Sequence, residues 1–495
     1  MTSQISTIGL IAEYNPFHNG HAYQLEKIGE RYPDATIVVC MSGSFTQRGL
    51  AAIADKWTRA EWAVRGGADL VLELPYAFAC RSAEHFATGG VQCLAGLGCV
   101  DALAFGTEAE TIKPLEKAAA CMDDAALQAA LHERIQKGAS YAVALSGEVA
   151  ERTGVAPEVL RAPNNILGIE YLRAMRKFAP EMKAVLVQRM GADYHDTDMH
   201  GSFASASAIR AALQKPPSSR GEDREAVGGV AKAGCESLMD CAGEGSHEEM
   251  PPTAQSSLSH ALPSPLLQSA SLTAPSEREP YIALQRVMPE DCLAALMAAL
   301  PDRLPCQDFL LRPLLARLLL LDGATLSSIC GMGEGLEHRL MEKAQTAQSF
   351  EKLVGAVATR RYPRSRIARL LVHVLTGFTA EAAVAFDATG PRYLRVLAMN
   401  ERGAKLLHRA KKTARLPIIT KTSQFLKSRD LLRPCASFTP LQQMLLFDVR
   451  ATELREFSVP ERGRTAADFC TSPFFFQPPS QRGDGPRERR GESPA

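Results

Sequence analysis

The stretch IGLIAEYNPFHNGHAYQLEKI, residues Ile8 to Ile28, decides how the amino-terminal part of the chain folds. Its apolar start predicts a buried β-strand over Ile8–Tyr14, and its end carries a helical pattern that extends over Ala22–Arg31. A short loop, which closes with HNGH at residues 18–21, joins the two. In parallel sheets such loops lie at the carboxyl ends of the strands, where ligands bind. We therefore expect chemistry in this loop.

The remainder of residues 1–214 continues the alternation of short β-branched runs and longer helical patterns. The runs predict strands at Ile8–Tyr14, Thr36–Met41, Asp69–Leu74, Ala102–Phe105 and Ala184–Gln188, and the patterns predict helices at Ala22–Arg31, Lys56–Arg65 and Asn165–Lys177. Strands that alternate with helices form a parallel sheet with crossover helices. The predicted fold class of this part is therefore α/β.

Composition divides the rest of the chain into three segments. Residues 215–280 are rich in Pro, Ser, Gly and Glu and show no sustained apolar period, which predicts a disordered insertion. Residues 281–470 are predicted to form a mostly helical domain, and in Arg364–Leu375 the apolar residues fall on one helical face. Residues 471–495 return to Pro, Gly and Arg, which predicts a disordered tail.

Charge is balanced over the whole chain but not along it. The 495 residues are 46% hydrophobic and 22% charged, as in an ordinary globular protein. The 56 Lys and Arg residues nearly match 55 Asp and Glu residues, so a net charge of +1 excludes attraction of nucleic acid by the chain as a whole. Residues 281–495, however, hold 32 basic and 21 acidic side chains. This local excess favours an RNA partner for the carboxyl-terminal part.

Cysteine usage and the amino terminus predict a cytoplasmic protein. The 12 cysteines are scattered from Cys40 to Cys470 without a CxxC pair, which favours reduced thiols over a disulfide framework or a structural zinc site. Residues Met1 to Thr7 carry no Lys or Arg, and Glu13 interrupts the apolar run behind them. We therefore expect neither a signal peptide nor a membrane span.

The HNGH loop has the residue types that a polyphosphate site needs. Gly20 lets a nucleotide approach the backbone, and the helix that starts here directs unpaired N–H groups and its positive dipole end toward anions. His18 and His21 are three residues apart, so both can face one phosphate on the first helical turn. There they would stabilise charge that develops on the α-phosphate and on departing pyrophosphate. The alternative is that the two histidines only cap the helix or pack against the core.

The loop resembles the HxGH motif of the nucleotidyltransferase superfamily, which includes adenylyltransferases and class I aminoacyl-tRNA synthetases. More narrowly, EYNPFHNGH is similar to the hallmark of the tRNA(Met) cytidine acetate ligase family. Further stretches that are similar to this family are MSGSFTQRG (41–49), DKWTRAEWAVRGGADLVLELP (55–75), FGTE (105–108), PNNILGIEYL (163–172), QRMGADYHD (188–196), RRYPRSRIARLL (360–371) and LPIITK (416–421). One departure is Leu50-Ala51, where Glu-Pro is typical of the family, and it leaves the shape of that loop open.

The resemblance implies a Rossmann-like nucleotidyltransferase domain at residues 1–214, followed by a basic, helical, tRNA-binding domain at residues 281–470. It implies that His18 and His21 are catalytic. Its ATP site, transferred by motif, consists of Ile11, Ala12, Glu13, Tyr14, Asn15, Pro16, Phe17, His18, Asn19, Gly20, His21, Ala22, Tyr23, Gln24, Gly106, Asn164 and Arg189. Asn165 is the alternative to Asn164, and the other asparagine of the pair would cap the following helix.

Two further groups are weaker candidates for phosphate contacts. The segment from Ser205 to Arg210, SASAIR, is similar to the second phosphate-binding segment of the superfamily, and its serines and Arg210 could hold pyrophosphate. A plain helix cap is the alternative. Lys56 and Arg59 lie one helical turn apart and could reach a carboxylate or a phosphate, although charges on an exposed helix face usually have no specific role.

The activity that the resemblance implies is an ATP-dependent ligase. It would activate acetate as acetyl-adenylate and acetylate the N4 amine of the wobble cytidine of elongator tRNA(Met), with magnesium expected on the phosphates. No metal-ligand cluster is visible in the sequence. One alternative is an adenylyltransferase that makes a nucleotide cofactor, which would not need a basic helical part. Another is a non-catalytic RNA-binding protein, which would not need an intact HxGH motif. The oligomeric state and the acetate pocket stay open.

Overall fold

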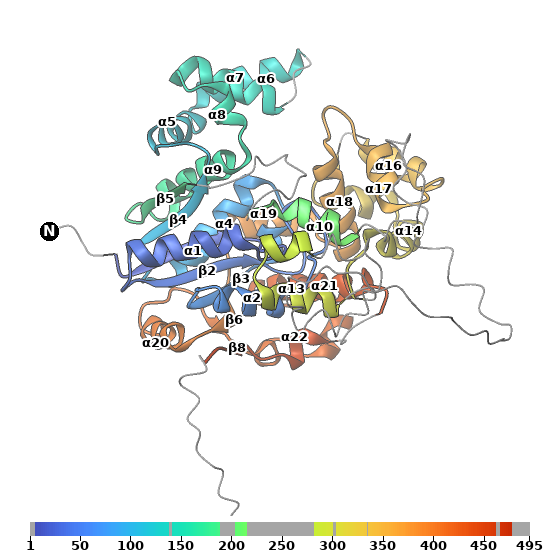
Figure 1. Ribbon diagram of the computed structural model, residues 1–495. Helices are drawn as coiled ribbons and strands as arrows, with labels where there is room; N and C mark the ends of the chain where they lie inside the picture. Colours follow the sequence, from blue (N-terminus) through green and yellow to red (C-terminus); the bar gives the residue numbers. More distant parts are fainter. Residues whose placement is uncertain are drawn as a thin grey trace, which may run out of the picture.

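A computed structural model describes residues 5–137, 141–188, 203–214, 282–299, 303–333, 335–461 and 466–477. Within these ranges the chain forms one eight-stranded sheet covered by helices on both faces (Figure 1). The strands from the amino-terminal part are β1 (Thr7–Ala12), β2 (Thr36–Ser42), β3 (Leu70–Leu74), β4 (Ala102–Thr107) and β5 (Lys183–Gln188). They pair in the order β5-β4-β1-β2-β3, and every pair among them is parallel. The predicted α/β fold class is confirmed.

The predicted strands are all present, with small changes at their ends. Strand β1 stops at Ala12 rather than at Tyr14, because Tyr14 adopts a left-handed backbone with φ 47° that no β-strand contains. Helix α1 (Asn19–Arg31) starts three residues earlier than predicted, because the side chain of His18 caps it. Helix α9 (Pro163–Phe178) also starts earlier, with Pro163 at a first-turn position that suits proline.

The carboxyl-terminal part adds three strands to the same sheet, and the sequence did not predict them. Strand β6 (Leu394–Met399) pairs antiparallel with β3, and β7 (Ile418–Ile419) and β8 (Phe474–Phe475) both pair parallel with β6. Residues 471–477, which were assigned to the disordered tail, therefore include a strand; the rest of that tail and the 215–280 insertion lie outside the described residues. The sheet is thus built from both ends of the chain.

Helices cover the sheet in two layers. One layer contains α1, α2 (Lys56–Arg65), α10 (Ala206–Gln214) and α13 (Glu290–Ala298), whose apolar residues share a core with β1. The other contains α4 (Ala83–Gly96), α9, α18 (Arg364–Thr376) and α21 (Pro440–Phe457). The predicted helix Arg364–Leu375 is confirmed as α18, which ends at Gly377 with φ 70°.

Among the remaining α-helices, Figure 1 shows α5 to α8 gathered in one group and α14, α16 and α17 in another. Those of the amino-terminal part are α3 (Tyr76–Ala79), α5 (Lys113–Met122), α6 (Ala125–Gln136), α7 (Tyr141–Thr153) and α8 (Pro157–Arg161). Those of the carboxyl-terminal part are α14 (Leu311–Leu320), α15 (Gly323–Ser327), α16 (Leu336–Ala344), α17 (Phe350–Val357), α19 (Ala380–Thr389), α20 (Glu401–Ala410) and α22 (Ala467–Cys470). Among the described residues, no helix has the length and apolar character to span a bilayer.

A buried polar network fastens the carboxyl-terminal helices to the sheet. Asp448 of α21 accepts a hydrogen bond from Tyr76 N at 2.7 Å and another from the hydroxyl of Tyr393. The Tyr76 hydroxyl lies 2.8 Å from Nδ1 of His373 and 3.1 Å from Oγ1 of Thr376, both on α18. Burial lowers the pKa of His373 to about 3, so its ring is neutral at pH 7. The network therefore joins α3, α18 and α21 without a net charge on the imidazole.

Stability should fall with rising pH because of Asp448. Burial raises the pKa of Asp448 to about 8, and the Glu73 carboxylate adds to the rise while Lys56 opposes it. Between about pH 4 and pH 8 the folded protein keeps a proton on Asp448 that the unfolded chain has released. The contribution of Asp448 to the free energy of unfolding is therefore full below about pH 4, and it is lost as the pH rises through about 8. We expect Asp448→Asn, which mimics the protonated acid, to flatten the decrease of the unfolding temperature between pH 6 and pH 8. Equal slopes for the two proteins in calorimetry would contradict this assignment.

Candidate active site

The order of the sheet places the candidate site between β1 and β4. From β1 the chain moves outward through β2 to β3, whereas β4 and β5 lie on the opposite side of β1. The strand order therefore reverses between β1 and β4, and α/β sheets bind ligands at such a switch point, beyond the carboxyl ends of the strands. The loop that follows β1 contains the HNGH motif, and the end of β4 contains Gly106, so both predicted segments meet here.

The loop after β1 is held in one shape by contacts to the neighbouring loops. Tyr14 has a left-handed backbone, and the Asn15–Pro16 peptide bond is cis. Oδ1 of the buried Asn15 accepts a hydrogen bond from Ile53 N at 2.7 Å. Phe17 is buried against Gly66, where a Cβ would collide with its ring. Asn15 and Phe17 therefore fix the course of the backbone that leads to His18.

His18 and His21 lie against each other at the start of α1. Their ring centroids are 3.8 Å apart and the rings are stacked. Nδ1 of His18 accepts a hydrogen bond from Gly20 N at 3.1 Å, and Nδ1 of His21 accepts one from His18 N at 3.3 Å. The predicted proximity of the two imidazoles is confirmed, and the alternative role in capping is real as well. Since each Nδ1 accepts a hydrogen bond, a neutral ring carries its proton on Nε2, the atom that can donate to a phosphate oxygen.

The segment from Ser205 to Arg210 reaches the same loop. Oγ of Ser205 accepts a hydrogen bond from Ala208 N at 3.1 Å and so caps α10. Nη1 of Arg210 donates to the carbonyl oxygen of Asn15 at 2.6 Å, and burial lowers the pKa of this guanidinium. The carboxylate of Glu13 opposes this lowering and the charge of Arg48 adds to it, so two cations, one carboxylate and the start of α10 lie near the HNGH loop. Such an arrangement favours a polyphosphate.

The two asparagines of the Asn164–Asn165 pair have different surroundings. Asn165 is buried, and its Oδ1 accepts hydrogen bonds from Thr107 Oγ1 at 2.6 Å and from Glu108 N at 3.0 Å. It therefore shapes the loop after β4 instead of capping α9, which corrects the expected cap. Asn164 is partly exposed and donates from Nδ2 to Glu108. Asn164 is therefore the more exposed member of the pair, and Gly106 lies in β4 just before the loop that Asn165 shapes.

The other predicted ATP-site residues follow the two ends of the loop. Ile11 and Ala12 end β1, and Ala22, Tyr23 and Gln24 lie in the first turns of α1. Asn19 donates from Nδ2 to the carbonyl oxygen of Arg286 at 2.9 Å, which ties the start of α1 to residues 282–299. Arg189 lies outside the described residues.

For Lys56 and Arg59 the alternative of charges on an exposed helix face is wrong, because both side chains are fully buried. Lys56 does reach carboxylates, those of Glu73 and Asp468, each at 2.8 Å. Arg59 donates from Nη1 to Glu13 O at 2.6 Å and from Nη2 to Ser42 O at 3.1 Å and to Gly43 O. Burial lowers its pKa to about 10, so the guanidinium still carries its charge at pH 7. Arg59 therefore holds together the ends of β1 and β2. The spacing of Lys56, Arg59 and the buried Ala60 and Ala63, which share one helical face, is the signal that could have revealed this.

The loop after β2, residues 43–54, connects the candidate site to the helical part. Its Gln47 N donates to Oε1 of Glu13 at 2.7 Å, and its Ala51 forms an antiparallel bridge with Phe45. Arg455 of α21 donates to the carbonyl oxygens of Ala52 and Ile53, each at 3.1 Å. The Leu50-Ala51 departure therefore leaves a closed, anchored loop.

Comparisons with known proteins agree with this geometry. The model of the HIGH nucleotidyl transferase family matches residues 5–271 and 266–467. The tRNA(Met) cytidine acetate ligase of Syntrophotalea carbinolica is 35% identical over 423 residues, which cover 84% of this chain and 85% of that protein. The ligase of the same name from Acetivibrio thermocellus is 32% identical over 459 residues, with coverage of 91% and 94%.

Two crystal structures of Thermotoga maritima TmcAL are similar over 95% of this chain and 99% of theirs. The apo form has a TM-score of 0.74 at 28% sequence identity, and the form bound with alpha-thio ATP has a TM-score of 0.72 at 27% identity. Taken with the family model and the sequence relatives, they show that this chain belongs to the HIGH nucleotidyl transferase family and, within it, to the tRNA(Met) cytidine acetate ligases.

Proposed function

We propose that this chain activates acetate with ATP and transfers the acetyl group to the N4 amine of the wobble cytidine of elongator tRNA(Met). One observation carries the proposal: the stacked imidazoles of His18 and His21 start α1 at the switch point of the sheet, beside the guanidinium of Arg210. This is a donor set for a nucleoside triphosphate. The choice of acetate as the acid and of tRNA(Met) as the RNA rests on the names of the relatives.

The first step joins acetate to the nucleotide. An acetate oxygen forms a bond to the α-phosphorus of ATP, the bond from that phosphorus to the bridging oxygen breaks, and pyrophosphate leaves. His18 and His21 would donate from Nε2 to oxygens whose negative charge increases in the transition state, and Arg210 would neutralise pyrophosphate. In the second step the cytidine N4 attacks the acetyl carbon, AMP leaves, and N4 loses a proton.

Magnesium would be bound mainly by the nucleotide. Among the residues that the structure describes, no group of three or more His, Cys, Asp or Glu side chains could hold a metal ion. The carboxylate of Glu13, which lies in the loop, already accepts a hydrogen bond from Gln47 N. The phosphate oxygens are therefore the ligands that would hold the ion, and there it would neutralise charge on the leaving pyrophosphate.

The test of this proposal is pyrophosphate exchange into ATP, measured with and without acetate. Exchange that depends on acetate and needs no RNA is expected for the ligase. A cofactor-forming adenylyltransferase would exchange only with its own nucleotide substrate, and a non-catalytic RNA-binding protein would not exchange at all. Mass spectrometry of nucleosides from tRNA(Met), incubated with the protein, ATP and acetate, would then identify N4-acetylcytidine.

We place the reaction in the cytoplasm. In support, none of the cysteines that the structure describes forms a disulfide, as is usual for proteins of a reducing compartment.

We propose that the tRNA binds to basic residues around the start of α18. The residues are Arg360, Arg361, Arg364 and Arg366. Three are exposed, and Arg366 is partly exposed with its guanidinium 4.6 Å from the ring centroid of Tyr362. The ion pair of Arg364 with Glu351 is open to solvent on both sides, so it would give way to a phosphate at little cost.

Neutralising these four arginines together should weaken tRNA binding. The salt dependence should also become shallower, by up to about 0.7 to 0.9 in the slope of log affinity against log salt for each phosphate that the protein no longer neutralises. Acetate-dependent exchange should be retained. A matched control removes four exposed cations elsewhere, on and after α20: Lys405, Arg409, Lys411 and Lys412. If the control weakens binding and the first variant does not, the tRNA surface lies at α20.

A further inference from the structure

The last described segment of the chain, residues 466–477, lies against the nucleotide-binding half of the protein. It contains α22 and β8, and we call it the clasp. Its strand β8 pairs with β6, and Phe476 N donates to Met399 O at 2.9 Å. Its helix α22 carries Asp468, which is buried although aspartate is rarely buried without a partner. The partners of this carboxylate therefore indicate its role.

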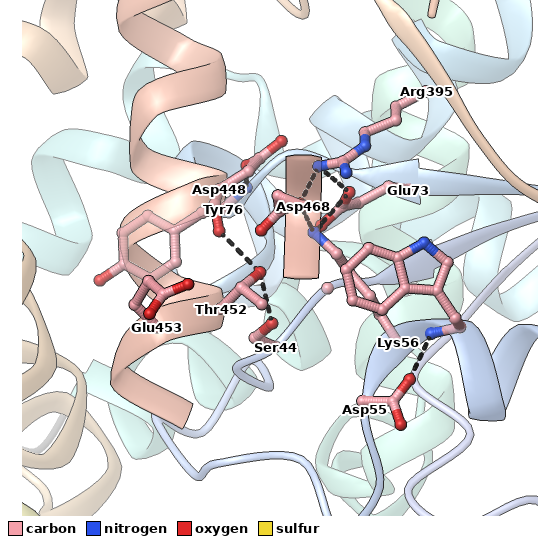
Figure 2. Close-up of polar contacts among 12 residues, drawn as sticks. Ser44, Asp55, Lys56, Glu73, Tyr76, Arg395, Asp448, Thr452, Glu453 and Asp468 are labelled. Carbon is pink, nitrogen blue, oxygen red and sulfur yellow. Dashed lines mark hydrogen bonds and ion pairs between the residues drawn. The ribbon is translucent and has the colours of Figure 1, made fainter. Parts of the chain in front are cut away.

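Asp468 belongs to a buried cluster of four charged side chains from four elements (Figure 2). Oδ1 of Asp468 lies 2.8 Å from Nζ of Lys56, the first residue of α2, and 2.5 Å from Nη1 of Arg395 on β6. Glu73 of β3 lies opposite, with Oε1 2.8 Å from Nζ of Lys56 and Oε2 3.1 Å from Nη1 of Arg395. Two cations therefore share two carboxylates, and the clasp supplies one of them.

The cluster is balanced only when Asp468 is present and ionised. Burial by itself would raise the pKa of Asp468, but the charges of Arg395 and Lys56 outweigh burial and lower the pKa to about 2. Asp448, which lies nearby, keeps its proton at pH 7 and adds no charge. If Asp468 were removed, Lys56 and Arg395 would share the single carboxylate of Glu73 in a buried site, which is costly.

The clasp also contacts the far end of α2. The guanidinium of Arg65, the last residue of this helix, lies 5.7 Å from the ring centroid of Phe474 and 5.3 Å from that of Phe476. These cation–π contacts come from the same short segment as Asp468. The clasp therefore touches both the first and the last residue of α2 and can fix the position of the helix along its axis.

Helix α2 in turn positions the loop between β1 and α1, which contains Glu13 and which we call the ATP loop. Arg59, one turn after Lys56, donates to the carbonyl oxygen of Glu13 in that loop and to those of Ser42 and Gly43 after β2. Gly43 lies directly on the carboxylate of Glu73, which leaves no room there for a Cβ. A continuous set of contacts thus leads from Asp468 through Lys56 and Glu73 to both loops that border the HNGH motif.

We infer that the clasp completes the adenylating half of the enzyme, and that Asp468 is a positioning residue for acetyl-adenylate formation. The inference rests on the proposed function only for the identity of the reaction that is measured. It assigns a role in the first chemical step to residues at the opposite end of the chain from the HNGH motif. Asp468 does not touch ATP; it acts through Lys56 and α2.

The experiment compares Asp468→Asn with the unchanged full-length protein. We expect the kcat/KM of acetate-dependent exchange to fall about 10-fold to 100-fold at a temperature where both proteins are folded, since small displacements of catalytic groups cost this much. The affinity for tRNA should not change. The control is Asp387→Asn, which breaks the ion pair of a more exposed carboxylate with Arg81 Nη1 at 2.6 Å, far from the clasp in sequence. It should lower the unfolding temperature without lowering exchange.

A second variant separates positioning from mere stability. Lys56→Met combined with Asp468→Asn leaves one cation, Arg395, and one carboxylate, Glu73, so the buried charge is balanced again. We expect this protein to regain unfolding temperature relative to Asp468→Asn but to keep the low exchange rate, because the contact between the clasp and α2 is still missing. Exchange that recovers together with stability, or Asp468→Asn with normal exchange, would overturn the inference. Absence of exchange in the unchanged protein would instead refute the proposed function. In that case the ATP affinities of the unchanged protein and Asp468→Asn would be compared, because they also depend on the position of the loop after β1.

Discussion

Replacing His21 by alanine is expected to slow acetyl-adenylate formation by about 100-fold to 1000-fold, with a much smaller change in the affinity for ATP. His21 lies in the first turn of α1. In the proposed mechanism its imidazole would meet charge that develops mainly as pyrophosphate departs. An interaction that is made only in the transition state lowers kcat when it is removed. His18→Ala should behave alike, because the two rings are stacked and serve one site. Single-turnover rates and equilibrium binding of ATP measure the two quantities separately.

The histidines also cap α1, so the experiment needs a variant that keeps the cap. Nδ1 of His21 accepts a hydrogen bond from His18 N, and an asparagine at position 21 can offer its Oδ1 to the same N–H group. His21→Asn should therefore retain the stability that His21→Ala loses and still be slow in chemistry. Equal losses of ATP affinity and rate in both variants would show that the histidine has only a structural role.

The second large effect is expected for Arg59→Met. The change removes the donors to four carbonyl oxygens, those of Glu13, Ser42, Gly43 and Ala54, around a fully buried guanidinium. Each carbonyl group left without a partner costs about 1–3 kcal/mol, so unfolding should occur at a clearly lower temperature. The ATP loop would also lose its connection to α2, and exchange should fall by about 100-fold in the folded protein.

Arg59→Lys is the conservative partner of this variant. Lysine keeps the charge but cannot reach several carbonyl groups with a planar fork, so we expect intermediate stability and intermediate exchange. Calorimetry and the exchange assay on the same samples should show that the unfolding temperature and the exchange rate both decrease in the order Arg, Lys, Met at position 59. If Arg59→Met had normal stability and normal exchange, the contacts to Glu13 and Gly43 would have no functional importance.

The sequence was sufficient for the parallel half of the sheet and for the centre of the site. The β-branched runs predicted β1 to β5, and the HNGH motif placed His18 and His21 side by side at a helix start, as the structure has them. These features are local, since each depends on fewer than about twenty consecutive residues. The convergence of Ser205–Arg210 on the same loop was expected only from the family resemblance, because no local pattern connects positions so far apart.

Features that depend on partners distant in the sequence could not be predicted. Strand β6 looks like any short apolar run, and only its pairing with β3 makes it part of the sheet. The sequence could not decide whether Lys56 contacts a carboxylate or is a solvent-exposed charge, because its partners, Glu73 and Asp468, lie on other elements and Asp468 is near the end of the chain. Arg189 lies outside the described residues, and its role in the ATP site stays a prediction.

The construction of one sheet from both ends of the chain affects its synthesis. Strand β3 has five buried residues and pairs with β2 on one side and with β6 on the other. At about 5–20 residues per second, the roughly 320 residues between β3 and β6 take about 15–60 s to emerge from the ribosome. During that time β3 is an open, apolar edge of the kind that joins other unfinished chains. Chains that end before residue 394 would keep this edge, so we expect them to aggregate, even though they contain the whole HNGH loop.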